Sequence, residues 1–192
     1  MDALWARGVR VPLVQCGPSL ARETRDRIGN TPWLHHVGFV SDAQLVTLYR
    51  RCSALVYPSR YEGFGLPVLE AMRMGAPVIC SGESSLPEVA GPAAQYVRWD
   101  DALEMSRVME RMANDPVLRA SLGTAGIRRA ALFSWRNTAA HTLAVFEATM
   151  GARRTADERL AIPRSVPFGS AEPLTAPAVI GAAAGLYGAH EA

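Results

Sequence analysis

Short apolar runs alternate with helical patterns over residues 9–97 of this 192-residue chain. Each apolar run has the length of a strand, and the stretch after it repeats its apolar residues at helical spacing. This alternation is typical of a parallel sheet whose strands are joined by crossover helices. The predicted strands are residues 11–16, 36–39, 54–58, 77–81 and 94–97. The pattern therefore predicts an α/β fold.

Two capping boxes mark the starts of predicted helices. Ser41 with Gln44, and Ser85 with Glu88, place a hydroxyl and a longer polar side chain three residues apart, where each can satisfy an N–H of the first turn. Residues 66–74 predict another short helix, because a proline is tolerated in its first turn and a glycine follows its end.

The pattern becomes wholly helical after residue 100. Met105, Met109 and Met112 recur on one helical face, which favours core packing over a soft binding face. The next segment opens at Asp115, and Ser134 is the predicted N-cap of one more helix.

The composition changes at residue 151. About half of residues 151–192 are Ala, Gly or Pro, without any periodicity, which predicts a disordered tail. The sequence thus divides into a domain over residues 1–150 and a tail over residues 151–192.

Composition narrows the possible chemistry. All 20 basic residues are Arg, so this polypeptide has no lysine for a Walker phosphate loop or a Schiff base. The net charge is only +2 and both signs are interspersed, which argues against nucleic acid as a partner. The three cysteines lie far apart, so neither a disulfide framework nor a zinc site is indicated.

Membrane and export signals are not recognisable in the sequence. No apolar run approaches the roughly 18 residues of a membrane span, and no basic segment precedes an apolar run at the start. We therefore expect a cytoplasmic protein without a transmembrane segment.

The segment most suggestive of chemistry follows the predicted strand 54–58. A loop with Gly63 and Gly65 leads into a helix, and loops at the carboxyl ends of parallel strands are where such sheets bind ligands. Backbone amides of a glycine-rich turn and a helix N-terminus attract anions such as phosphate. Glu62 and Glu70 flank this loop, and ionised carboxylates there suit hydroxyl groups of a sugar or ribose.

A simpler interpretation of the two glutamates exists. Glu70 favours an early helical turn whether or not it binds anything, and Glu62 can be a solvated loop residue.

Residues 57–72, Tyr-Pro-Ser-Arg-Tyr-Glu-Gly-Phe-Gly-Leu-Pro-Val-Leu-Glu-Ala-Met, closely resemble the Glu-x7-Glu region of family 4 retaining glycosyltransferases. Residues 37–41, 75–79 and 84–91 also resemble segments of that family, in the same order. The resemblance covers residues 11–150. It implies a Rossmann-like parallel sheet with flanking helices, the C-terminal half of a two-domain GT-B fold.

The resemblance also implies roles for individual residues. Glu62 would contact the donor sugar and stabilise charge near its anomeric carbon, and Glu70 would hold the ribose hydroxyls. The backbone at Val40 would contact the nucleobase. Sugar and phosphate would meet the backbone amides of Gly63, Phe64, Gly65 and Leu66. The implied partner is a nucleotide-diphospho-sugar, transferred with retention and without an obligatory metal or other cofactor.

A dinucleotide-binding fingerprint is an alternative for the same loop. Gly63 and Gly65 follow a strand, and Glu83 lies twenty residues beyond the first of them. Val68 argues against this alternative, because it stands where the fingerprint needs a glycine or alanine.

Relative to the family pattern, the chain lacks the N-terminal acceptor domain. It also lacks the first strand of the C-terminal domain and the loop whose Arg and Lys clamp the diphosphate. In a sheet of order 3-2-1-4-5-6, that strand belongs between residues 11–16 and 54–58. An empty place there would leave backbone groups unpaired at about 1 to 3 kcal/mol each, so we expect the isolated chain to be marginally stable.

Two hypotheses follow for the whole chain. In the first, it is the donor-binding half of a glycosyltransferase and is inactive alone. Either its coding start is misplaced, or its gene is truncated, or a second chain supplies the missing strand and domain. In the second, it is a non-catalytic remnant that binds a nucleotide sugar or docks on a partner.

Overall fold

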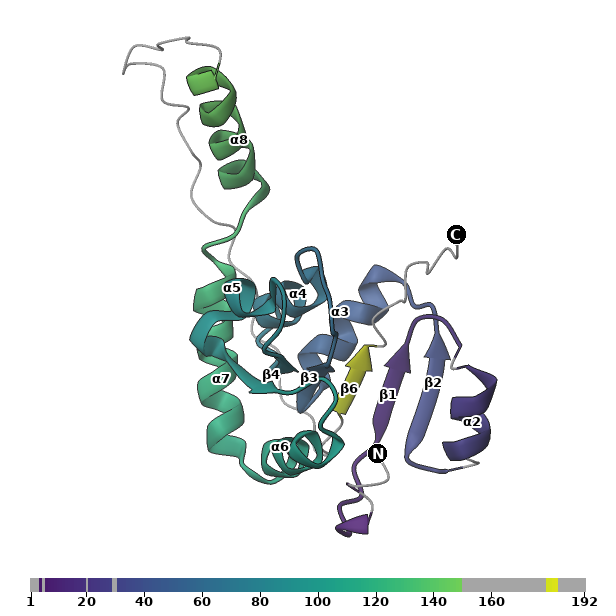
Figure 1. The fold of residues 1–192 in the computed structure, drawn as a ribbon. Helices are drawn as coiled ribbons and strands as arrows, with labels where there is room; N and C mark the ends of the chain where they lie inside the picture. Colours follow the sequence, from purple (N-terminus) through teal and green to yellow (C-terminus); the bar gives the residue numbers. More distant parts are fainter. Residues whose placement is uncertain (1–3, 5, 20, 29–30, 150–178, 183–192) are drawn as a thin grey trace. The chain divides into compact units, whose positions relative to one another are not determined.

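The computed structural model describes residues 4, 6–19, 21–28, 31–149 and 179–182. Its six strands form one sheet in the order β2-β1-β6-β3-β4-β5, and all pairings are parallel. Figure 1 shows β6 between β1 and β3. The strands are β1 (Leu13–Cys16), β2 (Leu34–Gly38), β3 (Ala54–Tyr57), β4 (Val78–Ser81), β5 (Ala94–Val97) and β6 (Val179–Ala182).

Helices connect consecutive strands, as a parallel sheet requires. The described helices are α2 (Arg22–Ile28), α3 (Asp42–Arg51), α4 (Leu66–Arg73), α5 (Leu86–Ala90), the 3₁₀ helix η1 (Gly91–Ala93), α6 (Ala102–Asn114), α7 (Pro116–Ala130) and α8 (Trp135–Thr149). The five strands and six of these helices confirm the predicted elements, with small shifts at the ends. The sequence did not predict α2, η1 or β6.

The two capping boxes had different outcomes. Ser41 caps α3 with both reciprocal bonds in place, as predicted. Ser85 precedes α5 but makes no side-chain cap, so the second capping box is wrong. Its hydroxyl instead donates to the carbonyl of Glu62, 2.9 Å away.

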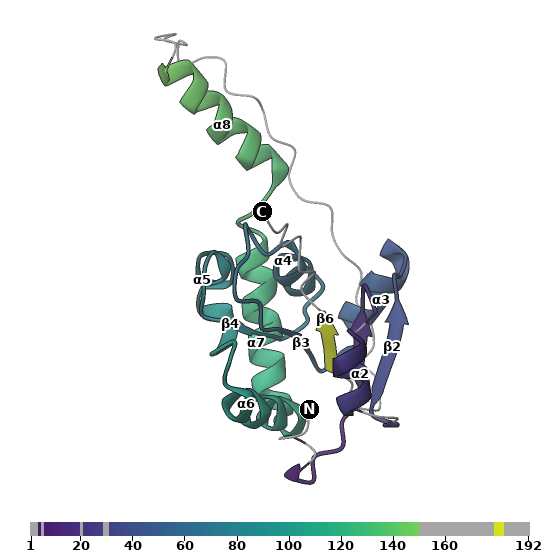
Figure 2. The same ribbon diagram turned by 45° about the vertical axis from the view of Figure 1, so that its right-hand side comes forward.

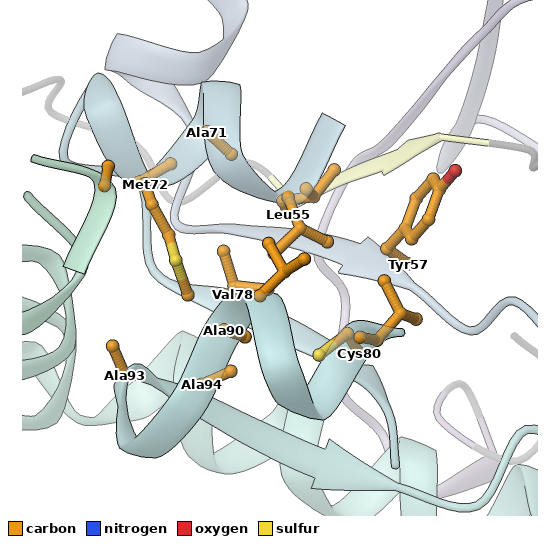
Figure 3. Close-up of a cluster of buried hydrophobic side chains, with 14 of the residues drawn as sticks. Leu55, Tyr57, Ala71, Met72, Val78, Cys80, Ala90, Ala93 and Ala94 are labelled. Carbon is orange, nitrogen blue, oxygen red and sulfur yellow. The ribbon is translucent and has the colours of Figure 1, made fainter. Parts of the chain in front are cut away.

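Strand residues alternate between two buried clusters, because successive side chains point to opposite faces of a sheet. Leu55 and Val78 face the cluster that packs under α3, α4 and α5 (Figure 3). Val56 and Ile79 face the other cluster, which includes Met109 and Met112 of α6 and the α7 residue Leu122. The methionine stripe is therefore core packing at two of its three positions, with Met105 packed against that cluster.

The helix α7 approaches α4 closely at glycines. A side chain on Gly123 would lie 2.5 Å from the carbonyl oxygen of Gly75, and one on Gly126 would meet Met72. Because these glycines have no side chain, α7 can pack closely against α4 and the turn after it.

The place between β1 and β3, where the sequence predicts a missing strand, is not empty. It is occupied by β6, which comes from the other end of the chain (Figures 1 and 2). Val179–Ala182, within the segment that the sequence predicts to be a disordered tail, forms β6, and the rest of that segment lies outside the described residues. Four residues within a run of Ala and Gly give too little alternation to predict a strand, because their pairing depends on two distant neighbours.

The chain divides into two compact units, Met1–Ala130 with Pro173–Ala192 and Ala131–Glu172. The described part of the second unit contains α8, whose first turn is capped by Ser134, as predicted. Over the residues that the structure describes, no helix has the length and apolarity needed to cross a membrane.

Candidate functional site

The loop between β3 and α4 lies at the carboxyl edge of the sheet, which is the ligand-binding edge of open parallel sheets. Gly65 is the N-cap of α4 and has a φ of 95°, a left-handed conformation that favours glycine. A side chain there would also lie 2.5 Å from Cδ2 of Leu86. The glycine therefore allows the turn that brings Leu66 to the start of the helix.

Glu62 lies half-buried in this loop, and its carboxylate is held from the sheet. The hydroxyl of Tyr57, at the end of β3, donates a hydrogen bond of 2.7 Å to Oε1 of Glu62. Burial raises the pKa of Tyr57, and the bond to Glu62 raises it further, so the phenol stays protonated and remains a donor. One carboxylate oxygen is thus oriented by the core, while carboxylates have further lone pairs for a ligand.

The backbone of Glu62 is held by the loop after β4. The hydroxyls of Ser84 and Ser85 donate to its carbonyl oxygen at 2.7 and 2.9 Å. Ser84 has a φ of 57°, in the left-handed region that residues other than glycine seldom adopt. Such a conformation persists where surrounding contacts enforce it, as these do.

The start of the loop is also tied to the sheet. The buried hydroxyl of Ser81, at the end of β4, donates to the carbonyl oxygen of Ser59. Ser59 in turn donates to the carbonyl of Tyr61 at 3.1 Å. The β3–α4 loop is therefore held at three carbonyl oxygens, those of Ser59, Tyr61 and Glu62. The hydroxyls that bind them come from β4, from the loop after β4 and from the β3–α4 loop itself.

Glu70 lies on α4 and is held by a second tyrosine. The hydroxyl of Tyr49, a buried residue of α3, is 3.4 Å from Oε2 of Glu70. Partial burial raises the pKa of Glu70, the bond from Tyr49 lowers it, and the charge of Asp42 raises it. The carboxylate is therefore partly desolvated and has only a weak internal donor.

Val40 lies apart from the glutamates, in a hollow of about 500 Å³ at the carboxyl end of β2. The hollow is lined by Val37, Phe39, Val40, Ala43, Gln44, Thr47 and Leu48. None of the residues 62–70 lines it. The helix α3 connects the two places, because it supplies Thr47 and Leu48 to the hollow and Tyr49 to Glu70.

The remaining predicted site residues follow Glu62 along the loop. Gly63 is exposed, and Phe64 and Leu66 expose 42% and 46% of their surface. These side chains are open enough for a ligand to reach the loop backbone. The guanidinium of Arg60, just before the site, lies 5.2 Å from the ring centre of Trp99.

The side chains that hold Glu62 and Glu70 were not predicted: Tyr49, Tyr57, Ser84 and Ser85. The two tyrosines occur at apolar positions of α3 and β3, and both belong to a buried core cluster. The pairing of Tyr57 with Glu62 had a usable signal in the sequence, because a tyrosine at the end of a buried strand precedes the glutamate by five residues. The serine contacts span 22 and 23 residues and have no local pattern.

Two further features of the described residues concern metal ligands and the dinucleotide fingerprint. Among the described residues, no three His, Cys, Asp or Glu side chains gather as a metal site would need. Val68, where a dinucleotide fingerprint needs a small residue, is fully buried in the core. Glu83, the acidic residue of that alternative, is exposed.

Comparison with known proteins gives one family. The family model of glycosyl transferases group 1 matches residues 4–129. The chain is 39% identical over 115 residues to O-antigen chain mannosyltransferase B of Escherichia coli, a match that covers 60% of this chain. The chain spans only 30% of that relative's length.

Two solved structures share the fold. HepE of Anabaena, in complex with UDP and glucose, has a TM-score of 0.63 and 20% identity over 77% of this chain and 43% of its own. The C-terminal domain of LpcC, a glycosyl transferase group 1 family protein from Francisella tularensis, has a TM-score of 0.52 and 15% identity. That match covers 68% of this chain and 90% of the domain.

Proposed function

The chain belongs to the group 1 glycosyl transferases, and from this membership we propose that it is the donor-binding half of a retaining glycosyltransferase. Its substrate is a nucleotide-diphospho-sugar, and its product is a sugar joined to an acceptor hydroxyl, with a nucleoside diphosphate as leaving group. The match to 90% of a C-terminal domain supports the assignment to that half.

The observation that carries the proposal is the pair of tyrosine-held glutamates. Tyr57 and Tyr49 each place one carboxylate oxygen from inside the protein, at Glu62 and Glu70. An ionised carboxylate accepts about four hydrogen bonds, so each glutamate keeps capacity for hydroxyl groups of a ligand. Two carboxylates on either side of a glycine loop, Glu62 firmly held and Glu70 only weakly held, suit a molecule that carries hydroxyls at both ends of a diphosphate.

The proposed roles of the loop residues are those that the resemblance to family 4 glycosyltransferases implies. Glu62 contacts the donor sugar and stabilises the positive charge that develops near its anomeric carbon. Glu70 accepts bonds from the ribose hydroxyls. The phosphates lie against the amides of Gly63, Phe64, Gly65 and Leu66, where the helix N-terminus favours negative charge.

The nucleobase lies in the hollow that Val40 lines, and the backbone of Val40 reads it. The apolar side chains of Val37 and Phe39 in this hollow suit a flat heterocycle. No metal is obligatory in the proposed reaction. We propose that the reaction takes place in the cytoplasm.

The named relative is a mannosyltransferase and HepE was solved with UDP and glucose, so nucleotide-activated mannose and UDP-glucose are the first donors to try.

Transfer itself requires an acceptor domain, supplied in the same polypeptide or by a partner chain. The chain spans less than a third of the named relative, so we propose that residues 1–192 bind donor without turning it over. The second candidate is a non-catalytic nucleotide-sugar-binding or partner-docking protein. It shares the donor site and differs in never gaining activity when an acceptor domain is supplied.

Calorimetric titration of the chain with UDP-, GDP- and ADP-sugars tests the proposal. We expect one nucleotide series to bind, with EDTA having no effect on the affinity. Glu70→Ala should weaken binding about tenfold or more, because each lost hydrogen bond to a charged group is worth about 1.5 to 3 kcal/mol. Glu88→Ala, an exposed carboxylate on α5, is the matched control and should bind as the wild type does.

A smaller effect is expected at the sheet side of the site. Tyr57→Phe removes only the hydroxyl that orients Glu62 and should weaken nucleotide-sugar binding more than free nucleotide binding. The proposal is wrong if no nucleotide sugar binds, or if Glu70→Ala binds as tightly as the wild type does.

A further inference from the structure

The strand β6 is the only described element that joins the two parts of the sheet. β1 pairs with β2 on one side and β6 on the other, and β3 pairs with β4 and β6. Among the described strands β1 and β3 do not pair with each other. Without β6, both would present unpaired N–H and C=O groups at the centre of the sheet, each worth about 1 to 3 kcal/mol if buried unsatisfied.

The central strand β6 is the last of the described strands in the sequence. All its neighbours lie within residues 13–97, and β6 begins at Val179, after the second compact unit of Ala131–Glu172. The central strand therefore follows all of its neighbours in the sequence. No short connection ties β6 to either neighbour, so it is held by strand pairing rather than by a tight turn.

We propose that the space between β1 and β3 is a strand-binding site, and that the C-terminal segment of the same chain is its ligand. Recognition is by backbone pairing on both sides, as in proteins that bind a peptide by strand addition. The register is defined by Val14 opposite Ile180 and by Leu55 opposite Ile180 on the other side. The segment Val-Ile-Gly-Ala carries no charge that a central place would have to bury.

The register also supplies a sharp test, because Cys16 lies opposite Ala182. Cα atoms on neighbouring strands are about 4.8 Å apart, which is within the range that a disulfide spans, and registered residues of parallel strands point to the same face. Ala182→Cys in the full chain should form a bridge to Cys16 on oxidation with diamide. Peptide mapping by mass spectrometry identifies the pair, and gel electrophoresis shows whether it lies within one chain.

Two controls bound this result. Gly181→Cys places the thiol one residue away, on the opposite face and opposite Gln15 and Val56, and should not bridge to Cys16. Ala182→Cys combined with Cys16→Ser should not bridge at all. A bridge that links two copies would overturn the binding of the segment by its own chain and show strand exchange instead. No bridge, or equal bridging to Cys52 and Cys80, would overturn the strand-binding site.

A second experiment tests binding without new thiols. Gly181→Pro removes an N–H from a strand paired on both sides and should lower Tm by about 5 °C or more. A synthetic peptide of residues 173–192, added to this variant, should restore Tm in a saturable manner, and the same peptide with proline at position 181 should not. Equal effects of the two peptides, or no recovery, would contradict the inference.

Occupancy of this site has a consequence for the donor site, which rests on the proposed function. The Glu62 loop follows β3 and the hollow of Val40 follows β2, so β6 sets the spacing between them. Gly181→Pro should weaken nucleotide-sugar binding, and the peptide should restore it. The chain could form the bridge between Cys16 and the new thiol and yet bind no nucleotide sugar. That result would support the strand-binding site and contradict only the proposed donor site.

Discussion

The two sides of the sheet differ in how they are stabilised. All four residues of β3 and of β4 are buried, and α4, α5 and α7 cover that half. In β1 only one residue of four is buried, and in β2 none is. The half with Glu62 and Glu70 is therefore a packed scaffold, whereas the half with the hollow of Val40 depends on β6 for its connection.

This difference matches the chemistry that each half is proposed to do. Positioning two carboxylates requires side chains such as Tyr57 and Ser81 to hold one geometry, and a dense core provides that. A base bound in a hollow by backbone and apolar contacts tolerates a less rigid surround. The contrast predicts that equivalent substitutions have unequal effects in the two halves.

The largest expected effect compares two valines. Val78→Ala in β4 empties a fully buried position, and Val37→Ala in β2 trims a side chain that is 46% exposed. Loss of two buried methyl groups with the cavity they leave should lower the free energy of unfolding by about 2 to 3 kcal/mol, against about 0.5 kcal/mol or less at position 37. Urea denaturation measures both, and equal losses would contradict the difference between the halves.

The next effect lies within the loop itself. Gly65→Ala forces a side chain into a left-handed conformation and against Leu86, which should lower the free energy of unfolding by about 1 to 3 kcal/mol. Gly63→Ala is the matched control, since a side chain there meets nothing within 4 Å, and should change it by about 0.5 kcal/mol or less. Thermal denaturation measures the stability of both variants. A Gly65→Ala variant as stable as Gly63→Ala would show that the turn before α4 does not require glycine.

The same division appears in what could be predicted from the sequence. The elements β3, α4 and β4 follow from apolar runs and glycine or proline signals, so the Glu62 loop was located correctly between strand and helix. The capping box at Ser85 was wrong, because its hydroxyl bonds the carbonyl of Glu62, a partner 23 residues away. Local patterns cannot reveal such partners.

The position of β6 could not be predicted for a related reason. A strand paired on both sides needs no polar face, and four residues of Val, Ile, Gly and Ala are compatible with many structures. Its place depends on two neighbours more than 120 residues away in sequence. The sequence indicated that a strand was needed between β1 and β3, but not which segment provides it.

The smallest expected effect concerns the charge of Glu70. Burial raises its pKa in the folded protein, which means that the folded state holds its proton more tightly than the unfolded state does. The resulting stability is fully present below the ordinary glutamate pKa of 4.5 and is lost as the pH rises through the higher folded pKa. Glu70→Gln cannot ionise, so its stability relative to wild type should increase from about pH 4.5 toward neutral pH.

The change should be a fraction of a kcal/mol, because Glu70 is exposed enough for solvent to screen its charge. Urea denaturation of both proteins between pH 4 and pH 8 measures it, with Glu83→Gln as an exposed control whose difference should stay within about 0.5 kcal/mol. If Glu70 accepts hydrogen bonds from a ribose, a saturating nucleotide sugar should favour its ionised form. The stability of the wild type should then gain most from ligand at neutral pH, and that of Glu70→Gln should gain less. A wild type that instead gains stability over Glu70→Gln as pH rises without ligand would show that Tyr49, rather than burial, dominates the environment of this carboxylate.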